Sequence, residues 1–234
     1  CDAELTVRAD HVFVAPPALV EAKTAVNPAT TFSPHGVDVE MFAMTQAEAT
    51  TLPAAAASLP RPVVGYFGLI AAWTDLELIE WLARSRPAWT FLLVGHASVD
   101  VSGLQSLSNV RLVGAQAYES LPGWAKAFDV AIIPYRLNQQ VRNANPLKLR
   151  EYLATGKPVV SVASPEINRF SELVHVADGR ESFLAGIESA LNHDSVEKRE
   201  QRIASVRSMS WESRAQESVQ IAMDALRRRK ARSP

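Results

Sequence analysis

The stretch VAIIPYRLNQQVRNANPLKLREYLATGKPVVSV (residues 130–162) decides the fold, because two apolar runs enclose one well-marked helix. Asn145 is a good N-cap and Pro146 suits the first helical position. Gly156, followed by Pro158, is a strong signal for the end of the helix. Both flanking runs are apolar throughout, which is typical of strands in a parallel sheet that is covered on both faces. The pattern therefore predicts a strand over 130–134, a helix over 146–155 and a strand over 158–162.

The same alternation continues on both sides of this unit. Further strands are predicted at 62–67, 90–95, 110–113 and 173–176, and helices at 75–86, 118–128 and 181–192. Apolar strands separated by helices form a parallel sheet with helices on both faces. The sequence therefore predicts an α/β fold over residues 62–208, a doubly wound parallel sheet of the Rossmann-like kind.

The residues before and after this domain differ in composition. Two short strands at 11–15 and 30–33 are predicted around a helix at 17–26. Residues 43–61 are rich in Ala, Thr and Pro and have no clean period, which predicts a linker. The basic tail, residues 209–234, contains a predicted helix over 211–232. It either packs on the domain or attaches to anionic lipid or to a further domain.

Composition and charge exclude several classes of protein. The 234 residues are 47% hydrophobic and 21% charged, which is typical of a folded globular chain. The net charge of -1 favours no nucleic-acid partner, and no apolar run is long enough to cross a bilayer. The only cysteine, Cys1, allows no internal disulfide, so a reducing, cytoplasmic location is expected. Because Cys1 has no Met before it, we expect a chain cut from a longer protein in preference to a lipid-modified N-terminus.

Charges at the start of the helix over 146–155 are informative about function. Lys148 lies in the first turn, where a cation opposes the helix dipole at a cost of roughly 0.3–1 kcal/mol unless an anion lies nearby. Arg142 approaches from the preceding loop, and free N–H groups after Asn145 converge on the same point, which suits phosphate. Glu151, one turn further on the same face, can accept hydrogen bonds from ribose hydroxyls. The spacing leaves an alternative open, an ordinary ion pair between Lys148 and Glu151 on a solvated helix.

Residues 145–160, NPLKLREYLATGKPVV, resemble the donor-binding helix of family 4 (group 1) glycosyltransferases of the GT-B fold. The resemblance extends in the right order along nearly the whole chain, to residues 9–13, 34–42, 64–68, 91–95, 110–114 and 210–214. It implies that residues 62–208 are the C-terminal domain, which binds a nucleotide diphosphate sugar. Residues 1–42 would be a remnant of the N-terminal acceptor domain with the interdomain crossover, and residues 209–234 the closing helix and tail.

The resemblance also implies roles for single residues. Glu151 contacts the nucleotide ribose, and Lys148 and the N–H groups after Asn145 hold the diphosphate. Gly68 lets the backbone approach the diphosphate, and the loop after Gly114 lies near the base. The implied donor-binding residues are Gly68, Gly95, His96, Gly114, Arg136, Arg142, Ala144, Asn145, Leu147, Lys148 and Glu151, and the implied catalytic residues are Asn143, Lys148 and Glu151. No metal ligand and no cofactor is expected, because transfer in this family is metal-independent.

Two features depart from the family pattern. Asn143 stands where the family has the first of two glutamates, although an amide can still hydrogen-bond a sugar hydroxyl or a phosphate. Family members also have an Arg and a Lys soon after the glycine that corresponds to Gly68, and residues 69–74 supply neither. Neutralisation of the diphosphate would then rest on Arg142, Lys148 and Arg136.

The expected function is transfer of a hexose, with retention, from a nucleotide diphosphate sugar to a polysaccharide or lipid-linked acceptor. The expected location is the cytoplasm, with peripheral contact at the inner membrane, and the chain alone is expected to be inactive if it is truncated. Motifs of dehydrogenases, P-loop NTPases and α/β-hydrolases do not occur in the sequence. Two alternatives stay open: a nucleotide-sugar-binding module without turnover, and a GT-B-like epimerase, against which Asn143 speaks.

Overall fold

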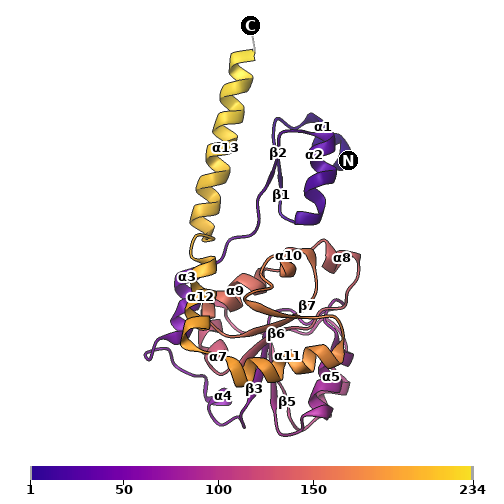
Figure 1. The fold of residues 1–234 in the computed structure, drawn as a ribbon, viewed down its shortest axis with the longest axis vertical. Coiled ribbons are helices and arrows are strands. Elements are labelled where there is room, and N and C mark those ends of the chain that lie inside the picture. Colours follow the sequence, from indigo (N-terminus) through magenta and orange to yellow (C-terminus); the bar gives the residue numbers. More distant parts are fainter. Residues whose placement is uncertain (1, 233–234) are drawn as a thin grey trace.

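The computed structural model describes residues 2–232, and a six-stranded sheet with all strands parallel forms its centre (Figure 1). The strands lie in the order β5-β4-β3-β6-β7-β8. Their bounds are β3 (Val63–Phe67), β4 (Thr90–Val94), β5 (Val110–Leu112), β6 (Val130–Ile133), β7 (Val159–Val162) and β8 (Val174–Ala177). The predicted α/β class with a doubly wound parallel sheet is thereby confirmed. Cys1, on which the expectation of a cut chain rests, lies outside the described residues.

Helices cover both faces of the sheet because the two halves of the chain run outward from its centre in opposite directions. α5 (Leu76–Ser85) connects β3 to β4 on one side, and α9 (Leu147–Thr155) connects β6 to β7 on the other. Since such crossovers are right-handed, the two helices lie on opposite faces. α11 (Arg180–His193) contacts α5, and α12 (Val196–Val206) contacts α9. The shorter helices are α6 (Ser102–Gln105), α7 (Leu121–Lys126), α8 (Gln139–Arg142) and α10 (Pro165–Asn168).

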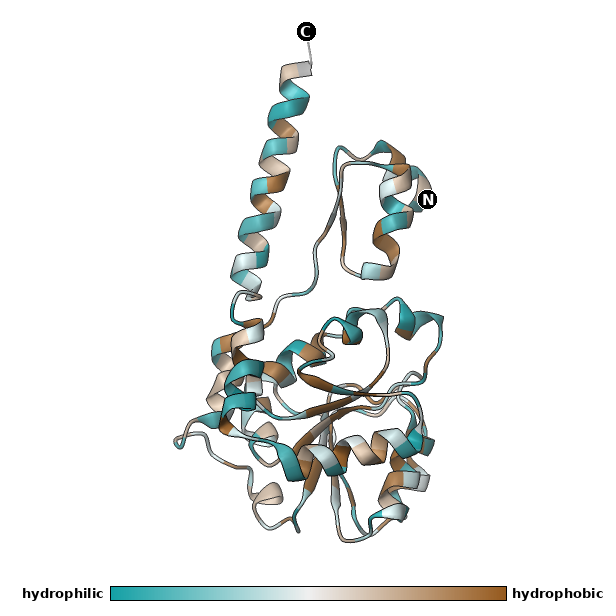
Figure 2. Cartoon of the chain, in the orientation of Figure 1, coloured by the Kyte–Doolittle hydropathy of each residue, from teal (hydrophilic) through white to brown (hydrophobic). Residues whose placement is uncertain are grey.

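The point where the chain reverses its direction across the sheet lies between β3 and β6. β3, β6 and the neighbouring β4 are buried along their whole length, so they form the centre of the core. Figure 2 shows that these strands are apolar. The connections that leave the carboxyl ends of β3 and β6 diverge, and in open α/β sheets this is the place where ligands bind. We call this place, at the carboxyl ends of β3 and β6, the crevice. Gly68 follows β3, and the loop that leads to α9 follows β6.

Residues 2–33 form a small unit above the sheet, which we call the N-terminal lobe (Figure 1). Its elements are α1 (Asp2–Arg8), β1 (Val12–Val14), η1 (Pro17–Leu19), α2 (Val20–Val26) and β2 (Thr30–Phe32), with β1 and β2 paired in parallel. Two contacts connect the lobe to the main domain. The Nδ2 atom of Asn145 donates to the carbonyl of Ala15 over 2.9 Å, and the Arg169 guanidinium lies 4.8 Å from the centre of the Phe32 ring.

The residues predicted as a linker lie against the main domain. They follow α3 (Val39–Ala43) and include η2 (Met44–Gln46) and α4 (Ala54–Ala57). Gln46 Nε2 donates to the Thr155 carbonyl over 2.6 Å, at the end of α9. Lys126 Nζ, at the end of α7, donates to the Ala47 carbonyl over 2.7 Å. This stretch is therefore fixed to α9 and to α7 at residues 46 and 47, although its composition has no helical period.

α13 (Trp211–Arg232) has the predicted bounds but does not pack on the main domain as expected. It extends away from the six-stranded sheet, alongside the N-terminal lobe (Figure 1), and Arg229 pairs with Asp10 of the lobe at 2.8 Å. On another face of the helix, Val219, Met223 and Leu226 are 62%, 46% and 45% exposed. Within residues 2–232, no helix combines the length and the apolar character that a bilayer span needs.

Candidate functional site

Two glycines allow the ends of β3 and β4 to approach each other closely. Gly68 has φ +123° and Gly95 has φ +149°, conformations that side-chain-bearing residues rarely adopt. A Cβ atom at Gly95 would lie 2.0 Å from the carbonyl oxygen of Gly68. A Cβ atom at Gly68 would lie 2.2 Å from Nζ of Lys148. Gly68, Gly95 and Lys148 are therefore brought together at the crevice, as three of the predicted site residues.

Lys148 extends from the first turn of α9 across Gly68. Its Nζ lies 5.2 Å from the centre of the Tyr66 ring and 6.0 Å from the centre of the Tyr135 ring, so aromatic faces support the charge. Burial lowers the pKa of Lys148, and the negative charge of Glu151 raises it in part. No ion pair with a carboxylate is formed by Lys148 in the described part of the chain. The ordinary surface ion pair that spacing alone allowed is therefore not what the structure contains.

Glu151 lies one turn further along α9 and is 4% exposed. Its Oε1 atom accepts a hydrogen bond from the Tyr118 hydroxyl over 3.1 Å. Burial raises the pKa of the Glu151 carboxyl, while Lys148 and the Tyr118 hydroxyl lower it. A half-buried cation and a buried carboxylate thus lie near each other on one helix, without neutralising each other by direct contact.

Asn145 does not cap α9, contrary to the prediction. The helix begins at Leu147 after Pro146, and no side chain accepts a hydrogen bond from its first N–H groups. Asn145 is 7% exposed, and its Oδ1 accepts a hydrogen bond from Arg150 over 2.7 Å while its Nδ2 donates to Ala15. The amide is therefore used to connect the helix to the N-terminal lobe. The uncapped N–H groups at the start of α9 remain suited to an anion.

A buried ion pair connects α9 to α10. Arg150 of α9 is 1% exposed and pairs with Glu166 of α10, which is 0% exposed. The guanidinium also lies 5.8 Å from the centre of the Phe170 ring. α10 begins after Ser164, whose side chain accepts a hydrogen bond from the Ile167 N–H. Sequence reasoning missed this pair, because the partners lie on different helices and no local spacing connects them.

Four more predicted residues lie on the approach to α9. Arg142 is exposed at the end of α8, while Asn143 and Ala144 are half-buried in the turn between α8 and α9. Leu147 is half-buried at the first position of α9. These residues border the uncapped end of the helix, and their contact with a ligand stays a prediction.

The remaining predicted residues are more scattered. Arg136 is directed to the start of α5, where it lies 3.8 Å from Asp75 and 3.2 Å from Glu77. Two carboxylates thus pair with this charge, and a contact of Arg136 with the diphosphate stays a prediction. His96 is exposed directly after Gly95, and Gly114 is exposed in the loop after β5, with φ +71°.

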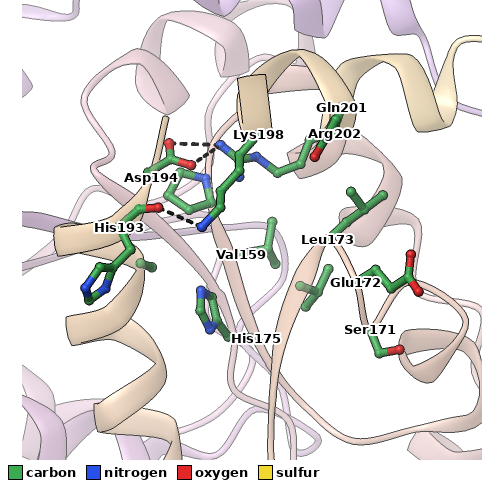
Figure 3. A pocket seen from close by; sticks show the side chains of 13 residues that line it. Val159, Ser171, Glu172, Leu173, His175, His193, Asp194, Lys198, Gln201 and Arg202 are labelled. Atoms are coloured by element: carbon green, nitrogen blue, oxygen red, sulfur yellow. Dashed lines mark hydrogen bonds and ion pairs between the residues drawn. The ribbon is translucent and has the colours of Figure 1, made fainter. Parts of the chain in front are cut away.

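Two cavities lie near the sheet edges. Figure 3 shows one of about 140 Å³ at the amino-terminal ends of β7 and β8, where Lys198 donates to the carbonyl of His193 and Arg202 donates to Asp194. Because the amino-terminal ends lie opposite the crevice, this cavity is separate from the site. A second cavity of about 330 Å³ lies at the carboxyl ends of β6–β8. Tyr135 lines it and also faces Lys148, so this cavity borders the crevice.

Replacing Gly68 by alanine is expected to destabilise the chain by about 1–3 kcal/mol, because the residue has φ +123°. The new methyl group must also displace the Lys148 ammonium, so ligand binding at the crevice weakens. Urea unfolding and calorimetry measure the two effects. Gly103→Ala in α6 is the control, since the nearest neighbour of a Cβ there is the Glu80 carboxylate of α5, 3.4 Å away. Equal stability of Gly68→Ala and Gly103→Ala would contradict the prediction that position 68 requires glycine.

The chemistry of the crevice suits a phosphorylated nucleoside. Uncapped N–H groups and the Lys148 ammonium favour phosphate oxygens. The Glu151 carboxylate, one turn away, suits sugar hydroxyls as hydrogen-bond donors. The position at the reversal of strand order is where α/β sheets bind nucleotides. Fold and crevice together are typical of Rossmann-like nucleotide-binding proteins.

Comparison with known proteins identifies the family. Residues 56–193, more than half of the chain, match the family model described as "Glycosyl transferases group 1". The chain therefore belongs to the group 1 glycosyltransferases, and the resemblance noted in the sequence is confirmed.

Similar proteins are longer than this chain. TuaH of Bacillus subtilis (strain 168), described as a teichuronic acid biosynthesis glycosyltransferase, is 30% identical over 158 residues, which are 64% of this chain and 40% of TuaH. The sucrose-phosphate synthase structure from Thermosynechococcus elongatus matches with a TM-score of 0.70 and 21% identity over 96% of this chain and 60% of its own. HepE of Anabaena, in complex with UDP and glucose, matches with a TM-score of 0.67 and 19% identity over 95% of this chain and 64% of its own. The chain thus spans less than two thirds of each, and the structural matches show the fold.

Proposed function

We propose that this chain binds the donor in a glycosyltransferase that moves a hexose from a nucleotide diphosphate sugar to a polysaccharide or lipid-linked acceptor, with retention. The observation that carries the proposal is the position of Lys148, whose Nζ lies over Gly68 at the crevice with Glu151 one turn away. Membership of the group 1 family supports glycosyl transfer. The complex of HepE with UDP and glucose supports a uridine diphosphate hexose as the first donor to test.

In this proposal, Lys148 and the uncapped N–H groups of α9 hold the two phosphates. When the bond between the sugar C1 and the phosphate oxygen breaks, negative charge grows on the leaving nucleotide diphosphate. Fixed positive groups stabilise this charge without reorganisation, and they act strongly where water is excluded. The leaving phosphate accepts the proton of the acceptor hydroxyl, so the chain supplies no separate general base. A metal ion has no part in the proposal.

The other predicted residues complete the donor site in this proposal. Glu151 accepts hydrogen bonds from the ribose, and Asn143 serves the hexose in place of a family glutamate. Gly68 gives the backbone close access to the diphosphate, and Arg142 supplies a second, exposed cation. The remaining contacts come from Gly95, His96, Gly114, Ala144, Asn145 and Leu147. Arg136, which pairs with Asp75 and Glu77 in the structure, would supply a further cation to the diphosphate.

The proposed lipid-linked acceptor determines where the reaction takes place. A lipid-linked acceptor places the reaction at the cytoplasmic face of the inner membrane. The basic run 227–230 at the end of α13 supports a peripheral contact there, because basic residues are attracted to anionic lipid.

Calorimetry with UDP, GDP, ADP and dTDP sugars tests the donor site. We expect one nucleotide class to bind, and Glu151→Ala to weaken its binding by roughly 10-fold through the loss of charged hydrogen bonds. Glu200→Ala, an exposed change on α12, is the matched control. Release of labelled hexose then separates turnover from binding alone. The absence of binding at millimolar concentration for every sugar would overturn the proposal.

A further inference from the structure

A buried carboxylate needs hydrogen-bond donors, and the partner of Glu151 comes from a distant part of the chain. The Tyr118 hydroxyl donates to Oε1 over 3.1 Å, and it is the hydrogen-bond donor to this carboxylate among residues 2–232. Burial and the charge of Glu151 raise the pKa of Tyr118, so its hydroxyl keeps its proton at neutral pH. The contact is therefore a hydrogen bond with a fixed direction, from tyrosine to carboxylate.

Tyr118 is held in place by packing against α3 (Val39–Ala43). It opens the turn η3 (Tyr118–Ser120), which follows the loop after Gly114. Its ring packs edge-on against Phe42 of α3, with centroids 5.7 Å apart, and Phe42 stacks on Phe67 of β3 at 5.7 Å. Tyr118 is nevertheless 40% exposed, while Glu151 is 4% exposed. The tyrosine thus reaches from the surface to the buried carboxylate.

We propose that Tyr118 is a positioning residue for the nucleoside: its hydroxyl occupies Oε1 of Glu151, which leaves Oε2 directed to the ribose and makes the site selective for ribonucleotides over 2′-deoxyribonucleotides. The inference deepens the proposed donor site and rests on it. A carboxylate that is free to rotate offers its oxygens in many orientations, whereas one that is fixed through Oε1 offers Oε2 in one. The 2′-hydroxyl of a ribose then gains a hydrogen bond that a deoxyribose lacks.

The charged and titratable groups around this contact are few. Those that interact with Glu151 or with Tyr118 are Lys148 of α9, Asp38 before α3, Glu119 of η3, and the tyrosines Tyr135 and Tyr152. The Tyr118 hydrogen bond lowers the pKa of Glu151, so its loss moves that pKa further upward. Because ribose binding uses the ionised carboxylate, affinity falls as pH drops through this pKa. Without Tyr118, the fall therefore begins at a higher pH.

The test uses UDP-glucose and its 2′-deoxyribose analogue, because the diphosphate of a nucleotide sugar does not titrate near neutral pH. Calorimetry of the full chain is carried out between about pH 5 and pH 8. For Tyr118→Phe, which keeps the ring against Phe42, we expect roughly 5- to 20-fold weaker binding of UDP-glucose at neutral pH. We also expect a smaller preference over the deoxy analogue and an acid fall in affinity that begins at higher pH.

Controls separate this inference from the donor site itself. Glu119→Gln changes an exposed neighbour on the same turn and is expected to leave affinity, preference and pH profile as they are. Glu151→Gln is expected to remove the acid fall. If the unchanged chain binds UDP-glucose and Tyr118→Phe keeps both the preference and the pH profile, the role of Tyr118 is wrong while the donor site stands. If the unchanged chain binds none of the UDP, GDP, ADP and dTDP sugars, both are overturned, and if it binds a class other than UDP, the same comparison is made with that donor and its deoxy analogue. Thermal unfolding checks that Tyr118→Phe is folded.

Discussion

Replacing Lys148 by methionine is expected to weaken the binding of the nucleotide diphosphate sugar by about 10- to 150-fold, which corresponds to the loss of charged hydrogen bonds worth about 1.5–3 kcal/mol. Methionine keeps most of the aliphatic stem under the Tyr66 and Tyr135 rings, so packing changes little. The ammonium, however, is lost from the position over Gly68, and Glu151 is left without a nearby cation. Calorimetry with the donor found in the panel measures the loss.

Lys157→Met is the matched control for this prediction. Lys157 is half-buried like Lys148, and burial lowers its pKa to about 8. It lies past the other end of α9, where its Nζ donates to the Lys126 carbonyl over 3.3 Å. Removal of this charge is expected to leave donor affinity unchanged. Equal losses of affinity in the two variants would show that overall charge, and not the place of Lys148, governs binding.

Glu166→Ala is expected to lower the free energy of unfolding by about 3–5 kcal/mol, because the change leaves the Arg150 charge buried without its partner. Both side chains are almost fully buried, and the guanidinium also donates to Asn145, which connects α9 to the N-terminal lobe. The substitution therefore disturbs the start of α9 as well as α10. Urea unfolding followed by circular dichroism measures the stability.

Two further variants show whether burial causes the loss. Glu80→Ala breaks the exposed pair with Arg84 on α5 and is expected to cost less than about 1 kcal/mol. The double change Arg150→Met with Glu166→Leu removes both buried charges, and we expect it to recover most of the stability. A loss in Glu166→Ala as small as that in Glu80→Ala would contradict this account of the pair.

The sheet could be predicted from the sequence because its strands are buried on both faces and are apolar throughout. The donor helix was equally clear at its C-terminal end, where Gly156 has φ +73°. Its start was less clear. Asn145 has the side chain of a good N-cap, but its amide contacts Ala15, far away in the chain, and local rules cannot include such a partner. The position of α13 beside the N-terminal lobe depends on contacts of the same long-range kind.

The candidate site also contains some residues that local sequence patterns indicate and others that only long-range contacts reveal. Lys148 and Glu151 could be singled out because a cation in the first turn of a helix is unfavourable without an anion. Tyr118 gave no such signal, since a tyrosine at the start of a helical pattern is typical of core packing. Arg150 also escaped notice, because a charged residue within a helix is expected on its solvated face. Only the fold shows that Glu166 lies opposite to it.

The contact of Lys148 with Gly68 has a consequence for folding. The two residues come from opposite halves of the sheet and are far apart in the chain, so the site forms only after slow, long-range pairing of β3 with β6. A partly folded chain has no place for the ligand. Binding therefore adds stability to the complete native state alone. A nucleotide-sugar affinity column would accordingly retain fully folded molecules and let misfolded ones pass.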